Sequence, residues 1–173
     1  MSSEPGPVRH LEIRLEKRDV ACVARLLDRD APRTCALIWD ALPQGGHAFH
    51  GKYARNEIYT LVESFAPAEP GPENTTVTPI PGDVCAFWFS AAELGSASHG
   101  YTPERRPAPD ARIVDLALFY ERNNLLLNPD FGWVPGTVFA TVVEGLDAMA
   151  AASQDMWLNG VAGERLSFHR VEQ

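Results

Sequence analysis

Alternation of polar and apolar residues predicts two strands at the start of the chain. Residues 10–15 read His-Leu-Glu-Ile-Arg-Leu, and residues 20–26 form a second, mainly apolar run after the polar turn Lys17-Arg18-Asp19. A period of two gives a strand one buried face and one solvent-facing face. Two such strands joined by a short polar turn are typical of a hairpin. We therefore expect the chain to open with an antiparallel hairpin.

Two later segments carry helical spacing instead. Asp30 is expected to cap the first helix, because its carboxylate can accept hydrogen bonds from free amides of the first turn, where Pro32 is tolerated. The second helix follows Gly145, which allows a sharp bend from strand to helix. The positions expected to face the core are Cys35, Ile38, Trp39 and Leu42 in the first helix and Leu146, Met149, Ala150, Ser153 and Trp157 in the second.

The rest of the chain predicts strands separated by loops. These strands fall at about residues 47–53, 57–63, 84–89, 112–120, 137–143 and 165–171. A proline-rich connection, residues 66–81, is expected to be an ordered surface loop, and residues 90–110 are expected to form a second, flexible polar loop. A lid or an interface arm is the alternative for both. The fold class is therefore mainly β: a closed, mostly antiparallel barrel of about eight strands with two capping helices. Residues 9–173 form one domain after a flexible tail, residues 1–8.

Composition narrows the possible partners and the compartment. The chain of 173 residues carries a net charge of −8 without a basic run, so neither nucleic acid nor a membrane surface is an expected partner. Cys22, Cys35 and Cys85 are widely spaced in apolar surroundings, which indicates buried free thiols in a reducing compartment. No secretion signal and no apolar run of membrane-spanning length is visible. We expect a cytoplasmic protein.

Two motifs resemble the cyclophilin family. Ala31-Pro32-Arg33-Thr34 is similar to the start of the first cyclophilin helix, and Val138-Phe139 with Val142-Val143-Glu144-Gly145-Leu146 is similar to the segment that leads into the second. The chain resembles an uncharacterised bacterial cyclophilin-like family more closely, around residues 72–76, 78–79 and 81–83. This resemblance implies the cyclophilin-like barrel and assigns no activity.

The resemblance to cyclophilins identifies one candidate for prolyl isomerisation. Arg55 in Tyr53-Ala54-Arg55 stands where the family carries the arginine that donates to the proline nitrogen as the peptide bond twists. The glutamine that follows in the family is replaced within Thr60-Leu61-Val62-Glu63-Ser64, and its histidine falls near Gly136. Robust isomerase activity is therefore not expected, and a weak or divergent isomerase stays as an alternative function.

The leading prediction is a module that binds a small molecule or a short peptide in a pocket on the barrel side. Arg55 would supply charge, toward a carboxylate, and aromatic residues would supply apolar contact. The residues expected in this pocket are His50, Arg55, Tyr59, Phe119, Tyr120 and Trp133. A structural homo-oligomer is the third possibility, with the apolar run at residues 87–89 or the loop at residues 66–81 in the interface.

Other constellations do not predict chemistry of their own. His47 and His50 are three apart on a predicted strand and therefore point to opposite faces, so no metal site is expected. Ser96 and His99 lie in a polar loop without a nucleophile elbow, which argues against a hydrolytic triad. No cofactor is predicted, because no glycine-rich phosphate loop is present.

Overall fold

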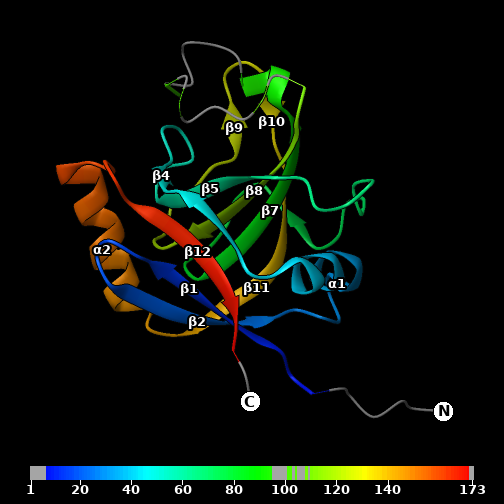
Figure 1. Cartoon of the computed structure of the whole chain (residues 1–173), viewed down its shortest axis with the longest axis horizontal. Coiled ribbons are helices and arrows are strands. Elements are labelled where there is room, and N and C mark those ends of the chain that lie inside the picture. Colours follow the sequence, from blue (N-terminus) through cyan, green and yellow to red (C-terminus); the bar gives the residue numbers. More distant parts are fainter. Residues whose placement is uncertain (1–6, 95–100, 103, 105–107, 109, 172–173) are drawn as a thin grey trace.

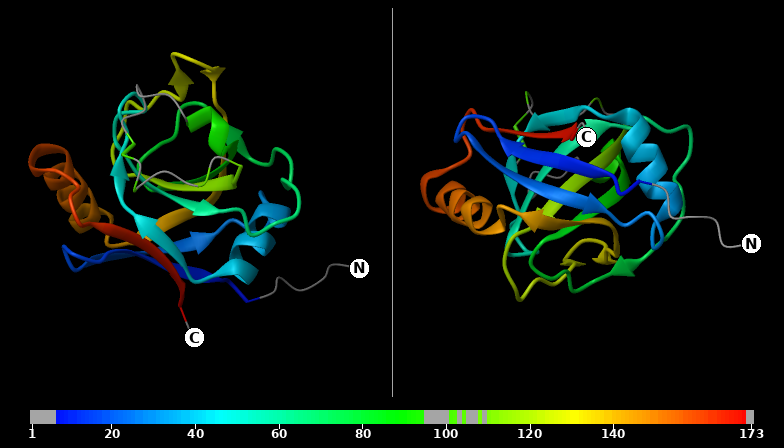
Figure 2. Two further views of the ribbon diagram at one scale, coloured as in Figure 1. Left: turned by 45° about the horizontal axis from the view of Figure 1, so that its top comes forward. Right: turned by 90° about the horizontal axis from the view of Figure 1, so that it is seen from below.

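The computed structural model describes residues 7–94, 101–102, 104, 108 and 110–171. A ten-stranded antiparallel sheet curls around the core (Figures 1 and 2). In order of pairing its strands are β3 (Gln44–His47), β12 (Arg165–Arg170), β1 (His10–Leu15), β2 (Val20–Leu26), β11 (Gly136–Glu144), β7 (Asp83–Ser90), β8 (Arg112–Phe119), β5 (Glu57–Glu63) and β4 (Phe49–His50), with β6 (Thr75–Thr76) paired to β11. The remaining elements are the ribbon β9 (Leu127–Asn128) and β10 (Gly132–Trp133), the short 3-10 helix η1 (Ala91–Leu94), α1 (Pro32–Ala41) and α2 (Leu146–Asn159).

The predicted opening hairpin and the mainly β, antiparallel class with two helices are confirmed. β1 and β2 pair from His10 opposite Arg25 to Leu15 opposite Val20. Closure of the barrel is not confirmed, because β3 and β4 end the order of backbone pairing. β3 nevertheless packs against β5, since a β-carbon on Gly46 would lie 2.8 Å from Oγ1 of Thr60. Residues 1–6 of the predicted tail lie outside the described residues. Most of the span from 95 to 109, including Ser96 and His99, also lies outside them.

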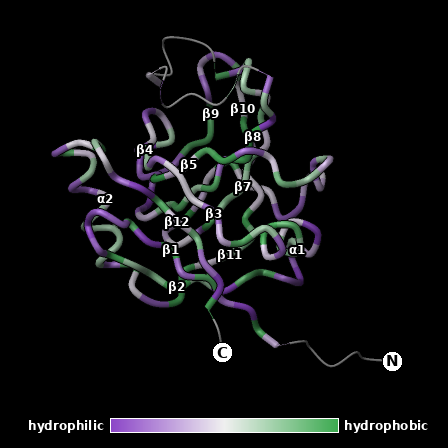
Figure 3. The backbone as a smooth tube through the Cα atoms, in the orientation of Figure 1, coloured by the Kyte–Doolittle hydropathy of each residue, from purple (hydrophilic) through white to green (hydrophobic). Residues whose placement is uncertain are grey.

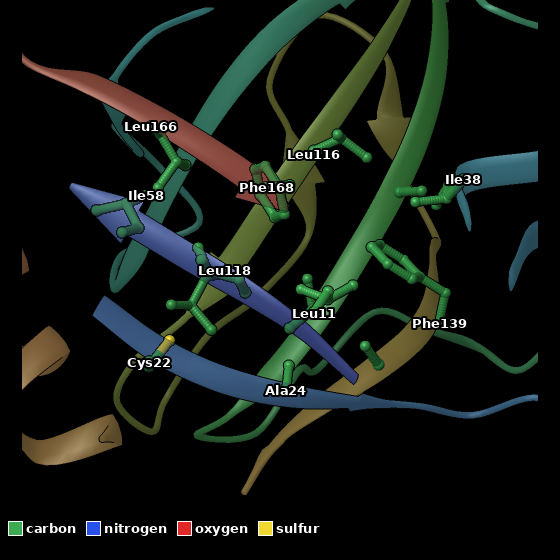
Figure 4. Packing of buried hydrophobic residues seen from close by; sticks show 14 of the residues in the cluster. Leu11, Cys22, Ala24, Ile38, Ile58, Leu116, Leu118, Phe139, Leu166 and Phe168 are labelled. Carbon is green, nitrogen blue, oxygen red and sulfur yellow. The ribbon is translucent and has the colours of Figure 1, made fainter. Parts of the chain in front are cut away.

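The core lies on the concave side of the sheet. Hydrophobic residues run along β7 and β8 (Figure 3), and alternate side chains of the surrounding strands meet inside. The three cysteines are buried and free, as predicted. Among the core residues in Figure 4 are Leu11, Cys22, Ala24, Ile38, Ile58, Leu116, Leu118, Phe139, Leu166 and Phe168. α2 packs beside β2 and β4 on one side of the molecule, and α1 packs against β11 on the other (Figure 1).

The cap of α1 differs from the prediction. Asp30 does not cap the helix: Ala31 holds that position and makes no side-chain capping bond. The carboxylate of Glu73, buried in the proline-rich connection, accepts hydrogen bonds from the amides of Arg33 (3.1 Å) and Thr34 (2.8 Å) and from the Thr34 hydroxyl (2.9 Å). Burial alone would raise the pKa of Glu73, but these donors lower it below its ordinary value. The connection is thereby tied to the helix.

The two helix tryptophans do not both enter the core as expected. Trp39 is half-buried, and the guanidinium groups of Arg9 and Arg170 each lie over its ring, 5.1 and 5.2 Å from the ring centroid. Trp157 is 58% exposed, whereas Met156 is buried in its place. One residue moves the helical direction by about 100°, so the core-facing stripe of α2 passes through Met156 and leaves Trp157 beside β4.

Replacing Glu73 with alanine is expected to destabilise the protein by about 1–3 kcal/mol, because it removes the cap and leaves buried amides without an acceptor. Glu69→Ala is the matched control, since Glu69 makes an exposed ion pair with Arg112 at 3.1 Å and should cost less than about 1 kcal/mol. Urea unfolding of both variants measures the difference. Equal destabilisation by the two substitutions would show that Glu73 is not the cap that matters.

Candidate binding site on the outer face of the sheet

The outer face of β5, β8 and β7 forms the floor of the candidate site. Tyr59 of β5 lies opposite Ala117 of β8, which lies opposite Cys85 of β7. Alternate residues of a strand share a face, so Glu57 and Asp115 point to this same outer side. A second hydrophobic cluster covers much of it, which explains why β7 is apolar on both faces. The cluster consists of Ala54, Cys85, Phe87, Ala117, Phe119, Leu126 and Val138.

Within this face lies a cavity of about 80 Å³, here called the carboxyl pocket. Its floor is formed by strand residues, and its walls come from the loop at residues 51–54, from Tyr101 and from the segment at residues 126–134. The residues that define it are Gly51, Lys52, Tyr53, Ala54, Glu57, Tyr59, Phe87, Phe89, Leu94, Tyr101, Asp115, Leu126, Asn128, Phe131 and Val134. Mostly apolar walls around a few polar groups are typical of a small-molecule site.

Two buried carboxyl groups are the main polar groups of the pocket. Glu57 and Asp115 are each 8% exposed. Within the described part of the chain neither side chain makes a hydrogen bond or an ion pair, and Oδ1 of Asp115 is fully buried without a partner. Burial raises the pKa of Glu57 to about 8. Burial also raises the pKa of Asp115 well above its ordinary value, and the charge of Glu57 raises it further.

Gly51 packs closely against Glu57. The amide of Gly51 donates a 2.7 Å hydrogen bond to the backbone carbonyl of Glu57. A β-carbon at position 51 would lie 2.7 Å from Oε2 of Glu57, so a larger residue there would require the carboxyl group to shift. The absence of a side chain at position 51 therefore leaves room for the carboxyl group of Glu57.

Tyrosine hydroxyls surround the carboxyl groups. Those of Tyr59 and Tyr101 are hydrogen-bonded at 2.6 Å, and the side-chain amide of Asn128 donates to the hydroxyl of Tyr53. Burial is the main cause that raises the pKa of each tyrosine, and the charges of Glu57 and Asp115 contribute in all three. All of these hydroxyls stay protonated at neutral pH and can donate or accept hydrogen bonds to a ligand.

The structure does not bring the residues expected from the sequence into one pocket. Tyr59 lines the carboxyl pocket, and Phe119 lies fully buried in the cluster that supports it. Trp133, on β10, is 58% exposed and lies outside the lining of the pocket. The other predicted residues, His50, Arg55 and Tyr120, line a neighbouring hollow.

This neighbouring hollow, here called the polar groove, lies between the loop at residues 51–56, β4 and α2. It shares Gly51 and Lys52 with the carboxyl pocket. Its remaining lining residues are His50, Arg55, Asn56, Tyr120, Gln154 and Trp157. Arg55 stands in the loop before β5, with a φ of 70°, and not on the strand.

The buried carboxyl groups are the candidate functional residues that sequence reasoning missed. Asp115 interrupts the otherwise apolar run of β8, Ile-Val-Asp-Leu-Ala-Leu-Phe, and a charge inside such a run is a recognisable signal because its burial is costly. Glu57 gave no such signal, since a glutamate at the start of a strand is ordinarily exposed. Its burial depends on Gly51 and on the loop above it.

The chain belongs to a family of proteins of unknown function, because the family profile matches nearly all of the chain. The family is DUF3830, described as a protein of unknown function, and the match covers residues 13–168. No curated protein sequence matches the chain. No helix of the described residues is long and apolar enough to cross a membrane.

Two solved structures share the fold. McbB in complex with tryptophan is similar with a TM-score of 0.62 and 17% identity, and the match covers 94% of this chain and 45% of that chain. The present chain therefore spans less than half the length of McbB. The hypothetical protein AF2241 from Archaeoglobus fulgidus is similar with a TM-score of 0.50 and 22% identity, over 98% of this chain and 100% of that chain. At these identities the likeness concerns the fold alone.

Glu57→Gln is expected to stabilise the protein near pH 8 and to change little near pH 4.5. The unfolded chain loses the Glu57 proton near the ordinary pKa of 4.5, whereas the folded chain keeps it up to about 8. Wild-type stability therefore falls between these two values, and the glutamine variant removes this loss. Each pKa unit between the two states corresponds to about 1.4 kcal/mol, so we expect a gain of roughly 4 kcal/mol near pH 8, and each kcal/mol raises Tm by roughly 2–4 °C in a chain of this size.

Thermal unfolding at the two pH values tests this, with Glu63→Gln at the exposed end of β5 as control. A Glu57→Gln gain that is the same at both pH values would contradict a protonated, buried Glu57.

Proposed function

We propose that the protein binds a small organic cation, a protonated amine attached to an apolar body, in the carboxyl pocket. The observation that carries this proposal is the pair of buried carboxyl groups, Glu57 and Asp115, which lack a partner among the described residues. A buried carboxyl without a partner costs several kcal/mol or stays protonated. A ligand cation supplies the missing charge and donors.

An ammonium group suits the floor of this pocket. It carries a positive charge and up to three N–H donors, and charge-assisted hydrogen bonds to carboxylates are among the strongest in proteins. The exposed Lys52 is the cationic side chain among the described lining residues, and its charge is not a cause of the pKa shift of either carboxyl group. The two carboxyl groups are therefore available to bind the ammonium group of a ligand.

The walls suit an apolar or aromatic ligand body. Phe87 and Phe89 stack with ring centroids 6.1 Å apart, and Tyr59 stacks on Phe49 at 5.3 Å. Aromatic faces add attraction for a cation as well as apolar contact. McbB, which shares the fold, has been solved with tryptophan, a molecule that combines an amine and an aromatic ring. That complex supports the proposal by analogy of fold only.

The geometry favours binding over prolyl isomerisation. Isomerisation as the cyclophilin resemblance implies it needs an arginine beside the apolar residues that hold the proline ring. Arg55 lines the polar groove, while Tyr59 lines the carboxyl pocket and Phe119 is fully buried. A short peptide stays possible as a ligand only through a basic side chain or a free amino terminus that reaches the carboxyl groups.

Calorimetric titration with benzylamine tests the proposal, with benzyl alcohol as the neutral control and phenylacetate as the anionic control. We expect saturable binding of benzylamine and at least about tenfold weaker binding of both controls, since a charge-assisted hydrogen bond contributes more than about 1.4 kcal/mol. Asp115→Asn should weaken benzylamine binding by a similar factor, and Glu63→Gln should leave it unchanged. Equal binding of the amine and the alcohol would overturn the proposal.

Amine affinity is also expected to rise with pH up to about 8. Glu57 keeps its proton below that value, and a bound cation favours the carboxylate, so binding releases a proton. One released proton raises the affinity up to about tenfold per pH unit. Titrations in buffers of different ionisation enthalpy measure the release directly. In Glu57→Gln the proton release should fall, and what is left should come from Asp115, whose pKa is also raised by burial; release that persists undiminished in that variant would contradict the assignment.

A further inference from the structure

The polar groove has a chemical character opposite to that of the carboxyl pocket. Its free space is about 290 Å³, and none of its described lining residues is acidic, although the chain has 23 acidic and 15 basic residues. Lys52 and Arg55 both line it. A hollow that gathers positive charge on a negatively charged protein concentrates anions at that point.

Three donors around the groove are unused. Within the described part of the chain, the guanidinium of Arg55, the side-chain amide of Gln154 and the indole N–H of Trp157 make no hydrogen bond to protein. The Trp157 ring lies 5.1 Å from the His50 ring, which also lines the groove. Several side chains with unused N–H donors line one hollow that has no carboxylate among its described lining residues, and this combination matches the requirements of an oxyanion.

The backbone at Arg55 adopts a strained conformation. Its φ of 70° is unusual for a residue other than glycine, asparagine or aspartate. The next residue, Asn56, fixes the loop: its amide donates to Asn124 at 3.1 Å, its side chain donates to the Arg122 carbonyl at 2.8 Å, and its carbonyl accepts from the Tyr120 amide at 3.0 Å. A strained residue that its neighbours hold in place is a feature of binding sites.

The half-buried His50 and the buried Tyr120 form a hydrogen-bonded pair in the lining of the groove. Nδ1 of His50 lies 3.0 Å from the Gly51 carbonyl, which can only accept, so Nδ1 carries the hydrogen. Burial lowers the pKa of His50, although its bond to Gly51 opposes the shift, and the neutral ring accepts from the Tyr120 hydroxyl through Nε2 at 2.7 Å. Tyr120 is 4% exposed and therefore fixed. The bond between the two rings thus fixes one part of the groove lining.

We propose that the polar groove binds a single oxyanion, a carboxylate or a phosphate group, through Arg55 with Gln154 and Trp157 as further donors. The guanidinium fork matches both anions, since each can accept two parallel N–H bonds. The proposal does not depend on the carboxyl pocket, because simple anions without an amine test it.

NMR titration of the full chain with acetate, with inorganic phosphate and with chloride, at constant ionic strength, tests this inference. We expect saturable shifts of the Trp157 indole N–H and of the amides in residues 51–56 with acetate or phosphate, and none with chloride. Stronger binding of acetate would assign a carboxylate ligand, and stronger binding of phosphate would assign a phosphate ligand. An absence of saturable shifts with both oxyanions would overturn the proposal.

The matched variants separate a specific site from diffuse charge. Arg55→Gln should weaken oxyanion binding at least about tenfold, and Arg55→Lys, which keeps the charge but loses the fork, should weaken it less. Arg122→Gln removes the same charge from a neighbouring loop, where Arg122 is 80% exposed, and should change affinity by less than about twofold. Equal losses in Arg55→Gln and Arg122→Gln would show that net charge alone attracts the anion.

Discussion

The register between β5 and β8 determines both the core and the candidate site. Their pairing runs without a break from Glu57 opposite Phe119 to Glu63 opposite Ile113. Because side chains alternate between the two faces, a slip of one residue would turn Glu57 into the core and Ile58 toward the outside. The apolar residues that hold the register by packing inside therefore also hold the carboxyl groups outside. A change in the pairing of β5 and β8 would therefore disturb the core and the candidate site together.

The same ladder explains how the fold tolerates two buried acids. Ile58, Leu116 and Leu118 are fully buried on the inner face, and each buried side chain of this size contributes about 1.5–3 kcal/mol. Glu57 and Asp115 weaken the outer face, and their neighbours on the inner face offset the loss. Sites that bind or react often retain groups that lower stability, because function requires those groups in an unsatisfied state.

Local sequence patterns predicted the elements well where the cause is local. The alternation that placed strands at residues 10–15, 20–26 and 57–63 reproduces β1, β2 and β5. The prediction that Asp30 caps α1 was wrong because Glu73, some forty residues away, accepts the hydrogen bonds of the first turn instead. No local sequence pattern indicates a contact between segments so far apart. The prediction that Trp157 faces the core was wrong because a shift of one residue along α2 separates the buried Met156 from the exposed Trp157.

The candidate site was harder to predict because loops cover its side chains and bury them. A strand pattern gives the face of Glu57 but not whether another segment covers that face. Arg55 and Tyr59 are four residues apart and were expected together, yet the left-handed turn at Arg55 sends them into different hollows. Only Asp115, inside an apolar strand, carried a signal in the sequence itself.

The loop at residues 51–56 is the element on which both hollows depend. Gly51 lines both of them, Ala54 is 2% exposed and belongs to the outer cluster, and Arg55, the next residue, lines the polar groove. The amide of Gly51 bonds to β5, and its carbonyl bonds to His50 in the polar groove. One short segment therefore separates an acidic, aromatic pocket from a basic groove. A chain of this net charge can present both only because backbone geometry, rather than composition, decides which charges meet.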